Sequence, residues 1–248
     1  MKTFISSVKY PLSVLFWLAL WHVASLVIAS PIILVSPIQT FIRLFELAGQ
    51  GFFWYSISFS LIRIMLGFLL ALLVGILAAS LTAQSKILYT LALPAVNTVK
   101  AIPVASFTIL ALMWIDSSNL STFIAFVTVM PIVYFNTYEG IKNTDAKLLE
   151  MSRVFAVPAY KVIANVYIPG VLPHVVSAAA SGLGFAFKAG VAAELIGFAR
   201  NTIGFNLHTA RVFLQTADML AWTIAIVLLS YLMEKILRLC LKRVEKWR

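Results

Sequence analysis

The chain has 248 residues, of which 62% are hydrophobic and only 11% are charged, and its formal net charge is +10. A soluble domain carries about 25% charged residues. The apolar residues also come in long blocks, so a water-soluble fold is excluded and lipid is the indicated solvent. The basic residues lie mostly between and beyond these blocks, where membrane topology explains them without nucleic acid. Cys240 is the only cysteine, which excludes an intrachain disulfide and a metal site built from thiolates.

Six apolar blocks are long enough to cross the ~30 Å hydrocarbon core of a bilayer as helices. A transmembrane β-barrel would instead show alternating segments of about ten residues, and backbone groups in lipid must be hydrogen-bonded internally. We therefore predict an all-α integral membrane protein with six transmembrane helices in one domain, residues 1–248. The predicted spans are 11–29, 57–82, 87–115, 119–140, 170–198 and 219–238.

The first block resembles a signal peptide, because Lys2 and Lys9 precede an apolar run. The run is longer than the apolar part of such a signal, and Ser30-Pro31 makes a poor cleavage site. We therefore interpret this block as a retained first span.

Two prolines and two long connections interrupt the pattern of spans. Pro94 and Pro103 are expected to break the third span, because proline removes a backbone donor from a helix. The segments 30–55 and 199–218 are longer than simple turns. We expect each of them to form a short helix at the outer surface of the membrane.

Lysine and arginine are distributed unevenly between the two sides of the membrane. With a cytoplasmic N-terminus, thirteen of them fall on the cytoplasmic side and three on the other. Cytoplasmic loops carry such an excess of basic residues, so we expect both termini and the loop 141–168 to be cytoplasmic. The three basic residues on the outer side are Arg43, Arg200 and Arg211. The tryptophans at predicted outer ends, where an aromatic belt would lie, are Trp54, Trp114 and Trp222.

The loop 141–168 is too short to form a domain and too apolar to be a mere linker. Pro158 would break a helix from within but suits the first turn of a new one. We therefore expect two short helices that meet near Ala156-Val157. Two interpretations of the loop remain open: an amphipathic helix that lies on the inner leaflet, or a projection that fits a groove in a cytosolic partner.

From Glu150 this loop resembles the cytoplasmic motif of ABC importer permeases. The family pattern is Glu-Ala-Ala, three residues, Gly, nine residues, and Ile-x-Leu-Pro. The chain has Glu150-Met151-Ser152, Ala156 and Val166-Tyr167-Ile168-Pro169 at the same spacing. Because Ala156 does not readily adopt a positive φ, we expect the turn to be right-handed or to be shaped by Pro158.

Other stretches within residues 35–240 resemble the nitrate, sulfonate and taurine group of these permeases. Each stretch is weak evidence alone, but the ordered set at the right topological positions is specific. The stretches are Ser36-Pro37, Ser60-Leu61-Ile62-Arg63, Gly67-Phe68, Lys100-Ala101-Ile102-Pro103, Leu172-Pro173, 184–194 and Ala221-Trp222-Thr223.

The resemblance implies a type I ABC importer permease fold in the bacterial cytoplasmic membrane, with a coupling helix seated in a cleft of an ATPase subunit. It implies two ATPase subunits, a second permease copy or a paralogue, and an extracytoplasmic binding protein that delivers a small anionic or organic solute. The ATPase would bind ATP and Mg, and no cofactor is expected in this chain, which lacks the GxxxxGK[ST] loop. The contact with the ATPase is expected in the 148–162 loop, at Glu150, Met151, Ser152, Arg153, Phe155, Ala156, Val157, Pro158, Ala159 and Tyr160.

Arg63, Lys188 and Glu194 fall within predicted spans. A charge at the centre of a helix in the membrane costs about 2.5–3.5 kcal/mol on insertion scales, so such residues usually face the protein interior or a wet cavity. One interpretation is that these residues line the translocation path and that the cations favour an anionic substrate. The other is a structural Arg63–Glu194 pair, with Lys188 hydrogen-bonded locally or extended toward the membrane surface.

Two other classes of membrane protein fit the sequence less well than an importer subunit. A stand-alone, ion-coupled secondary transporter would more naturally show inverted repeats and discontinuous helices in both halves, whereas only the third span is clearly interrupted here. An intramembrane enzyme would need a carboxylate pair or a His/Ser grouping, and no such grouping is visible. The histidines His22, His174 and His208 are scattered and do not suggest a metal site.

Overall fold

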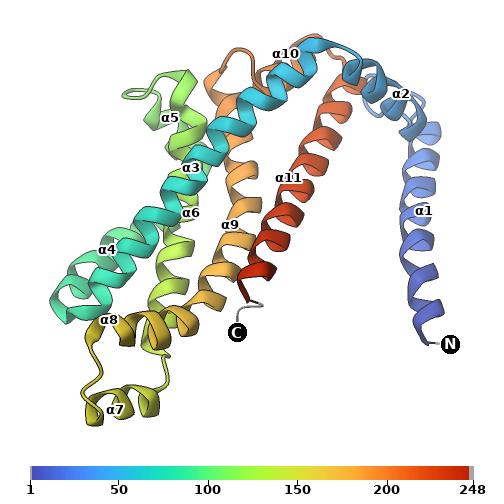
Figure 1. Cartoon of the computed structure of the whole chain (residues 1–248). Coiled ribbons are helices and arrows are strands. Elements are labelled where there is room, and N and C mark those ends of the chain that lie inside the picture. Colours follow the sequence, from blue (N-terminus) through green and yellow to red (C-terminus); the bar gives the residue numbers. More distant parts are fainter. Residues whose placement is uncertain (1, 246–248) are drawn as a thin grey trace.

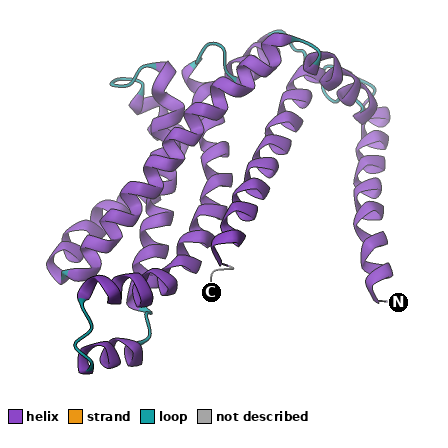
Figure 2. Ribbon diagram, in the orientation of Figure 1, coloured by secondary structure: helices purple, strands orange, loops and turns teal. Residues whose placement is uncertain are grey.

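Helices make up all the regular secondary structure that the computed structural model describes, which is residues 2–245, with side chains for residues 12–239 (Figure 2). The all-α prediction is confirmed. The side chains of the basic residues near both termini, and of Cys240, lie outside the described residues. The elements are α1 (Lys2–Ile28), α2 (Pro37–Ala48), α3 (Gly51–Gln84), α4 (Lys86–Ala101), α5 (Val104–Ala111), α6 (Ser117–Lys142), α7 (Ala146–Val154), α8 (Ala159–Val162), the π-helical turn η1 (Ile163–Tyr167), α9 (Ile168–Gly197), α10 (Ile203–Val212) and α11 (Thr216–Glu245).

Four helices in the described chain are long and apolar enough to cross a membrane: α3, α6, α11, and α9 taken together with α8 and η1 as Ala159–Gly197. A fifth crossing is possible if α4 and α5, which are bent by 100°, form one span. The apolar part of α1, Leu12–Ile28, is shorter. The six predicted spans thus correspond to four long helices, one bent pair and α1. The two short helices predicted between spans are also present, as α2 and α10.

The bend between α4 and α5 lies at Ile102-Pro103. Ile102 is extended (φ −70°, ψ 128°), as a residue before proline prefers to be. Pro94, by contrast, lies inside α4, which continues past it. The prediction that both prolines break the span is therefore wrong for Pro94, because a membrane helix tolerates the loss of one backbone donor when its surroundings compensate.

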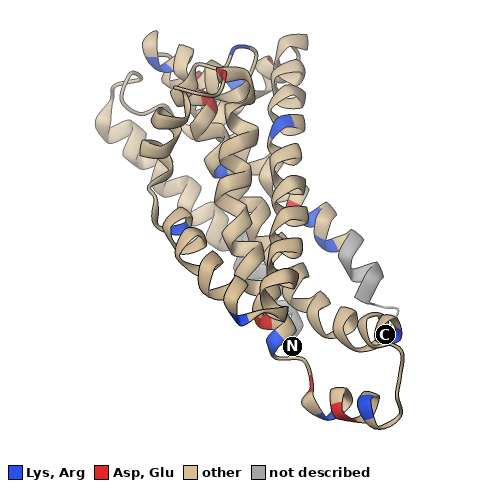
Figure 3. Ribbon diagram, turned by 90° about the vertical axis from the view of Figure 1, so that its left-hand side faces the viewer, with Lys and Arg blue, Asp and Glu red and all other residues tan. Residues whose placement is uncertain are grey.

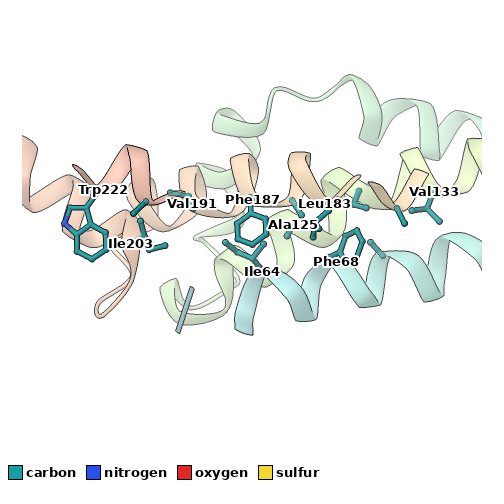
Figure 4. Packing of buried hydrophobic residues seen from close by; sticks show 14 of the residues in the cluster. Ile64, Phe68, Ala125, Val133, Leu183, Phe187, Val191, Ile203 and Trp222 are labelled. Atoms are coloured by element: carbon teal, nitrogen blue, oxygen red, sulfur yellow. The ribbon is translucent and has the colours of Figure 1, made fainter. Parts of the chain in front are cut away.

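α3, α6 and α9 pack against one another and form the core of the fold (Figure 1). Glycines permit the close approach, because a Cβ at Gly67 would lie 2.2 Å from the carbonyl oxygen of Thr122. A Cβ at Gly190 would lie 2.6 Å from the Ile64 side chain. Figure 4 shows buried side chains in a continuous row, and the labelled ones include Phe68, Val133, Leu183, Phe187, Ile203 and Trp222.

Trp222 belongs to this core and does not lie in an exposed aromatic belt. Its ring centroid is 4.8 Å from that of Phe53, and its side chain is buried. The prediction of an outer belt is therefore wrong for Trp222, because α2 and the start of α3 cover this part of α11. Trp54 and Trp114 are exposed, as the prediction requires.

α1 stands apart from the other long helices and joins them through α2 (Figure 1). The Trp21 indole N–H donates to the carbonyl oxygen of Val35 at 3.0 Å, which fixes the corner between α1 and α2. Arg43 of α2 forms an ion pair with Asp218 of α11 and another with Glu46. Hydrogen bonds to these carboxylates raise the pKa of Arg43 above its ordinary value. This contact fastens α2 to the start of α11.

Most charged residues lie toward the two ends of the bundle or in the segment that contains α7 (Figure 3). α7 projects beyond one end of the long helices, and the start of α1 and the end of α11 lie toward this same end (Figure 1). We call it the hairpin end. The opposite end carries α2 and α10, and we call it the α10 end.

Candidate functional site

α7 and α8 form a helical hairpin, residues 145–162, that projects from the hairpin end. Asp145 starts it, because its carboxylate Oδ1 accepts a hydrogen bond from the backbone N–H of Lys147 at 2.8 Å. The segment 155–158 connects the two helices, and Pro158 is the residue that caps α8. The prediction of two short helices that meet near Ala156-Val157 is confirmed.

The turn after α7 is left-handed at Ala156, whose φ is 48°. The N–H of Ala156 donates to the carbonyl oxygen of Arg153, and the N–H of Val157 donates to that of Ser152. This pair of hydrogen bonds is the Schellman arrangement, in which the left-handed position is usually glycine. Of the two predicted alternatives, the right-handed turn is therefore wrong: the two hydrogen bonds hold an alanine in the left-handed conformation that glycine usually adopts.

Apolar side chains of the hairpin are left uncovered by the rest of the chain. Val154 is 81% exposed, Phe155 is 73% exposed and Tyr160 is 69% exposed. A groove of about 290 Å³ runs between α7 and α8 and is lined in part by Leu149 and Val162. Such exposure of large apolar groups in one small element is typical of a contact surface.

The hairpin brings the ten predicted contact residues together, and nine of them are exposed. Ser152 is the exception, because it is buried and its hydroxyl donates to the carbonyl oxygen of Leu149 at 2.7 Å. The Ser152 hydroxyl therefore bonds within α7, and the residue lines the groove between α7 and α8. The exposed members are Glu150, Met151, Arg153, Phe155, Ala156, Val157, Pro158, Ala159 and Tyr160.

α8 continues through η1 into α9 as one helical run, Ala159–Gly197. The hairpin is therefore joined to the core without a loop on this side. η1 is a π-helical turn, and such turns inside α-helices often occur at functional sites. α8 and the first turns of α9 thus follow one another without an intervening loop.

Glu194 lies near the end of α9 and has no exposed surface. Its Oε2 accepts hydrogen bonds from the Ser60 hydroxyl at 2.8 Å and from the backbone N–H of Gly204 at 3.2 Å. The Ser60 oxygen also accepts from the N–H of Ile203 at 3.0 Å. These N–H groups belong to the first turn of α10, where they have no partner within the helix and favour a negative charge. Glu194 therefore fixes α10 to α3 and α9.

The backbone of α10 approaches Glu194 closely at Gly204. A Cβ at Gly204 would lie 2.4 Å from the Cβ of Glu194, so the contact needs glycine at this position. Glu194 Oε1 has no hydrogen-bond partner among the described side chains and backbone. We call the group of Glu194, Ser60, Ile203 and Gly204 the α10 corner.

The predicted Arg63–Glu194 pair does not form among the described residues, since no Arg63 nitrogen lies within 4.0 Å of that carboxylate. The guanidinium carbon of Arg63 lies 3.8 Å from the ring centroid of Phe59 instead, a favourable cation–π distance. Ser60 and the first turn of α10 occupy the place beside the carboxylate that the sequence assigned to Arg63. Sequence reasoning missed these partners because they come from segments far apart along the chain.

Lys188 is the one of the three charged span residues that is exposed on its helix. Its Nζ lies 5.7 Å from the ring centroid of Phe185. Ser177 and Ser181 are exposed on the same face, and a Cβ at Gly184 would meet open space. Positions i, i+4, i+7 and i+11 share one face of a helix, so this spacing could have revealed the stripe from the sequence. We call these residues, 177, 181, 184 and 188, the α9 stripe.

Within residues 12–239 no group of three or more His, Cys, Asp or Glu side chains could hold a metal ion. The geometry thus offers an exposed apolar hairpin, a continuous helix leading from it, and a polar stripe on that helix. Residues 71–246, which contain all three features, match the model of a protein family described as "Binding-protein-dependent transport system inner membrane component". The chain belongs to this family.

Similar proteins carry transport names. The chain is 30% identical to the putative aliphatic sulfonates transport permease protein SsuC of Bacillus subtilis (strain 168), over 93% of this chain and 84% of the relative. It is 28% identical to the taurine transport system permease protein TauC of Escherichia coli (strain K12), over 92% and 84% respectively. This inner membrane component is thus similar to permeases along almost its whole length.

Solved structures with the same fold are more distant in sequence. One is an amino acid ABC transporter, with a TM-score of 0.62 and 16% identity, over 79% of this chain and 94% of the other. Another is a bacterial alginate ABC transporter in complex with its alginate-bound periplasmic protein, with a TM-score of 0.61 and 13% identity, over 98% and 92%. The predicted permease fold is confirmed.

Proposed function

We propose that this chain is the permease subunit of an ATP-driven importer and that a separate ATPase drives it through the 145–162 hairpin. The observation that carries the proposal is the exposure of Phe155 and Tyr160 at the end of a helix that continues into the core. Large apolar side chains in water are unfavourable. A protein groove that covers them would stabilise the complex and give it a fixed orientation.

The different features of the hairpin end and the α10 end support an arrangement of the subunits. The hairpin end and both termini would face the cytoplasm, where two ATPase subunits would bind ATP and Mg. This chain would have no ATPase activity of its own, since it lacks a phosphate-binding Gly-Lys sequence. A second copy or a paralogue would complete the translocation path, and a binding protein would dock on the α10 end. The alginate transporter, whose structure includes a periplasmic protein, supports this arrangement.

Coupling would act through the helical run Ala159–Gly197. When the ATPase subunits close, they would pull α8, and α9 would move with it because no flexible loop separates the two helices. η1 would serve as the joint that absorbs the change of direction. The α9 stripe lies on this moving helix, so closure of the ATPases would change its access to either side of the membrane.

The substrate would be a small anion that passes the α9 stripe. Lys188 supplies an exposed positive charge within the span, and Ser177 and Ser181 supply hydroxyl groups on the same face. A cation in a membrane span usually faces a wet cavity or path. The similar permeases named for aliphatic sulfonates, taurine and nitrate support an anionic substrate class. Glu194 and Arg63 were predicted for the path as well, but the burial of Glu194 favours a structural role.

The test replaces Phe155 or Tyr160 by Asp in the assembled transporter and measures ATP hydrolysis stimulated by the loaded binding protein. An aspartate would bury an unpaired charge at the ATPase contact, so stimulation should be lost while the chain still inserts. Phe155→Leu and Tyr160→Phe are matched controls, because they keep an apolar side chain at the same exposed positions and should retain the stimulation. Full stimulation in both aspartate variants would refute the coupling. Transport by the purified chain without any ATPase would instead support a stand-alone, ion-coupled transporter.

A further inference from the structure

A second and larger groove, of about 590 Å³, opens between the ends of α3, α6 and α9 at the hairpin end. η1 borders it on the side of the hairpin. It adjoins the hairpin groove, with which it shares the lining residues Ile163 and Tyr167, and none of its lining residues belongs to the α9 stripe. The residues that line it are Ile76, Ser80, Ala83, Gln84, Thr137, Ile141, Ile163, Tyr167, Ile168, Val171, Leu172 and Val175.

The groove runs along the helices and is mainly aliphatic. Its α3 positions, from Ile76 to Gln84, share one face of the helix, and they extend about 12 Å along the axis at 1.5 Å per residue. No carboxylate is among the lining residues. An occupant must therefore be apolar and elongated.

The volume favours a single hydrocarbon chain over a helix from another protein. A helix is about 10–12 Å across and rises 5.4 Å per turn, so the groove would hold little more than about one turn of it. Such a short segment would not follow the groove along α3. A flexible acyl chain fits both the length and the volume.

The rim of the groove is basic. Lys142 Nζ donates a hydrogen bond to the carbonyl oxygen of Ala83, one of the lining residues, at 3.0 Å. Lys86 follows the groove segment of α3 by two residues, and Lys161 precedes Ile163 by two; all three lysines are exposed. Basic residues at the edge of a membrane span attract anionic lipid headgroups.

We propose that this groove binds one acyl chain of an anionic phospholipid from the leaflet at the hairpin end, with the headgroup beside Lys142. The assignment of that leaflet to the cytoplasmic side rests on the proposed function, but the groove and its basic rim do not. The lipid would occupy the space between α3 and the first turns of α9, where motion of the hairpin enters the core.

The test measures phospholipid that remains bound to the purified full-length chain after detergent washing, by native mass spectrometry. Val175→Trp fills the groove from α9 and should remove most of the retained lipid. Leu77→Trp is the matched control, because Leu77 is exposed on α3 outside the groove, and it should retain as much lipid as the unaltered chain. Equal retention in Val175→Trp and the unaltered chain would overturn the proposal.

A second variant keeps the test valid if Val175→Trp does not fold. Lys142→Gln preserves a donor for the Ala83 carbonyl and removes the charge. The preference for anionic over zwitterionic lipid should fall about fivefold, as expected for one basic residue near the surface. An unchanged preference would contradict the headgroup assignment.

If a second copy of the chain occupies the groove instead of a lipid, a different result is expected. Ser80→Cys in a Cys240→Ser background would then form a disulfide between two copies at the groove, which would overturn the lipid proposal. Retained lipid does not depend on the ATPase, so a failure of this proposal is distinguishable from a failure of the hairpin coupling.

Discussion

The α10 corner and the 145–162 hairpin lie at opposite ends of the same helical run, Ala159–Gly197. They differ in how far their side chains find contact partners within this chain. At the corner, a buried charge receives its hydrogen-bond donors from α3 and α10. At the hairpin, large apolar side chains have no covering element. The hydrogen bonds of the α10 corner are therefore made within one chain, whereas the apolar surface of the hairpin requires a partner protein to cover it.

Glu194 and Phe155 show how structural residues differ from residues available for function. Glu194 is conspicuous in the sequence because a charge in a membrane span is costly, yet its Oε2 receives hydrogen bonds from α3 and α10 inside the fold. Phe155 is not unusual by residue type, yet its side chain is 73% exposed in the segment that connects α7 to α8. Whether a side chain finds contact partners within the chain thus distinguishes the two roles better than residue type does.

The largest expected effect is the loss of stability when the corner is broken. Glu194→Ala would leave the Ser60 hydroxyl and the Gly204 N–H buried without their acceptor, and each such group costs about 1–3 kcal/mol. The midpoint of thermal unfolding in detergent should fall clearly. Glu139→Ala, at an exposed glutamate of α6, should leave the midpoint unchanged. Equal effects of the two substitutions would show that the corner does not hold α10.

The α9 stripe offers an intermediate effect that falls on transport and not on stability. Lys188→Met removes an exposed charge, so unfolding should be unaffected while transport efficiency falls roughly tenfold or more through loss of a charge-assisted contact. Lys188→Arg should retain most of the transport. Unchanged transport by a normally assembled Lys188→Met variant would remove Lys188 from the path.

The smallest expected effect concerns the left-handed turn of the hairpin. Ala156→Gly removes the steric cost of φ 48°, and the hairpin should gain about 1 kcal/mol. Hydrogen exchange at the Val157 N–H, which donates to Ser152, should slow about fivefold by this amount. Ala159→Gly, at the first residue of α8, should speed local exchange instead. Faster exchange in Ala156→Gly would contradict the assigned turn.

The sequence predicted the features that depend on composition along one segment. Long apolar blocks have few structural solutions in a bilayer, so the sequence predicts the spans, and it predicts the segments in which α2 and α10 lie but not the bounds of these two helices. Pro158 likewise marked the start of α8. Motif spacing also located the hairpin, because its helices are set by neighbours within the same segment.

The features that were missed depend on contacts between distant segments. The partners of Glu194 come from α3 and α10, and no local pattern connects them. Trp222 is buried by residues of α2 and α3, which its position at the end of a span did not reveal. The conformation of Ala156 was mispredicted because residue preference alone disfavours positive φ, whereas two backbone hydrogen bonds impose it.

Coupling through the hairpin is tested most directly by a photo-crosslinking amino acid at position 155 in the assembled transporter. A crosslink to the ATPase subunit, identified by peptide mass spectrometry, is expected. The same group at position 214, at the α10 end, should give no crosslink to that subunit. Crosslinks from position 155 to lipid alone would place the hairpin on the membrane surface and contradict its role in coupling.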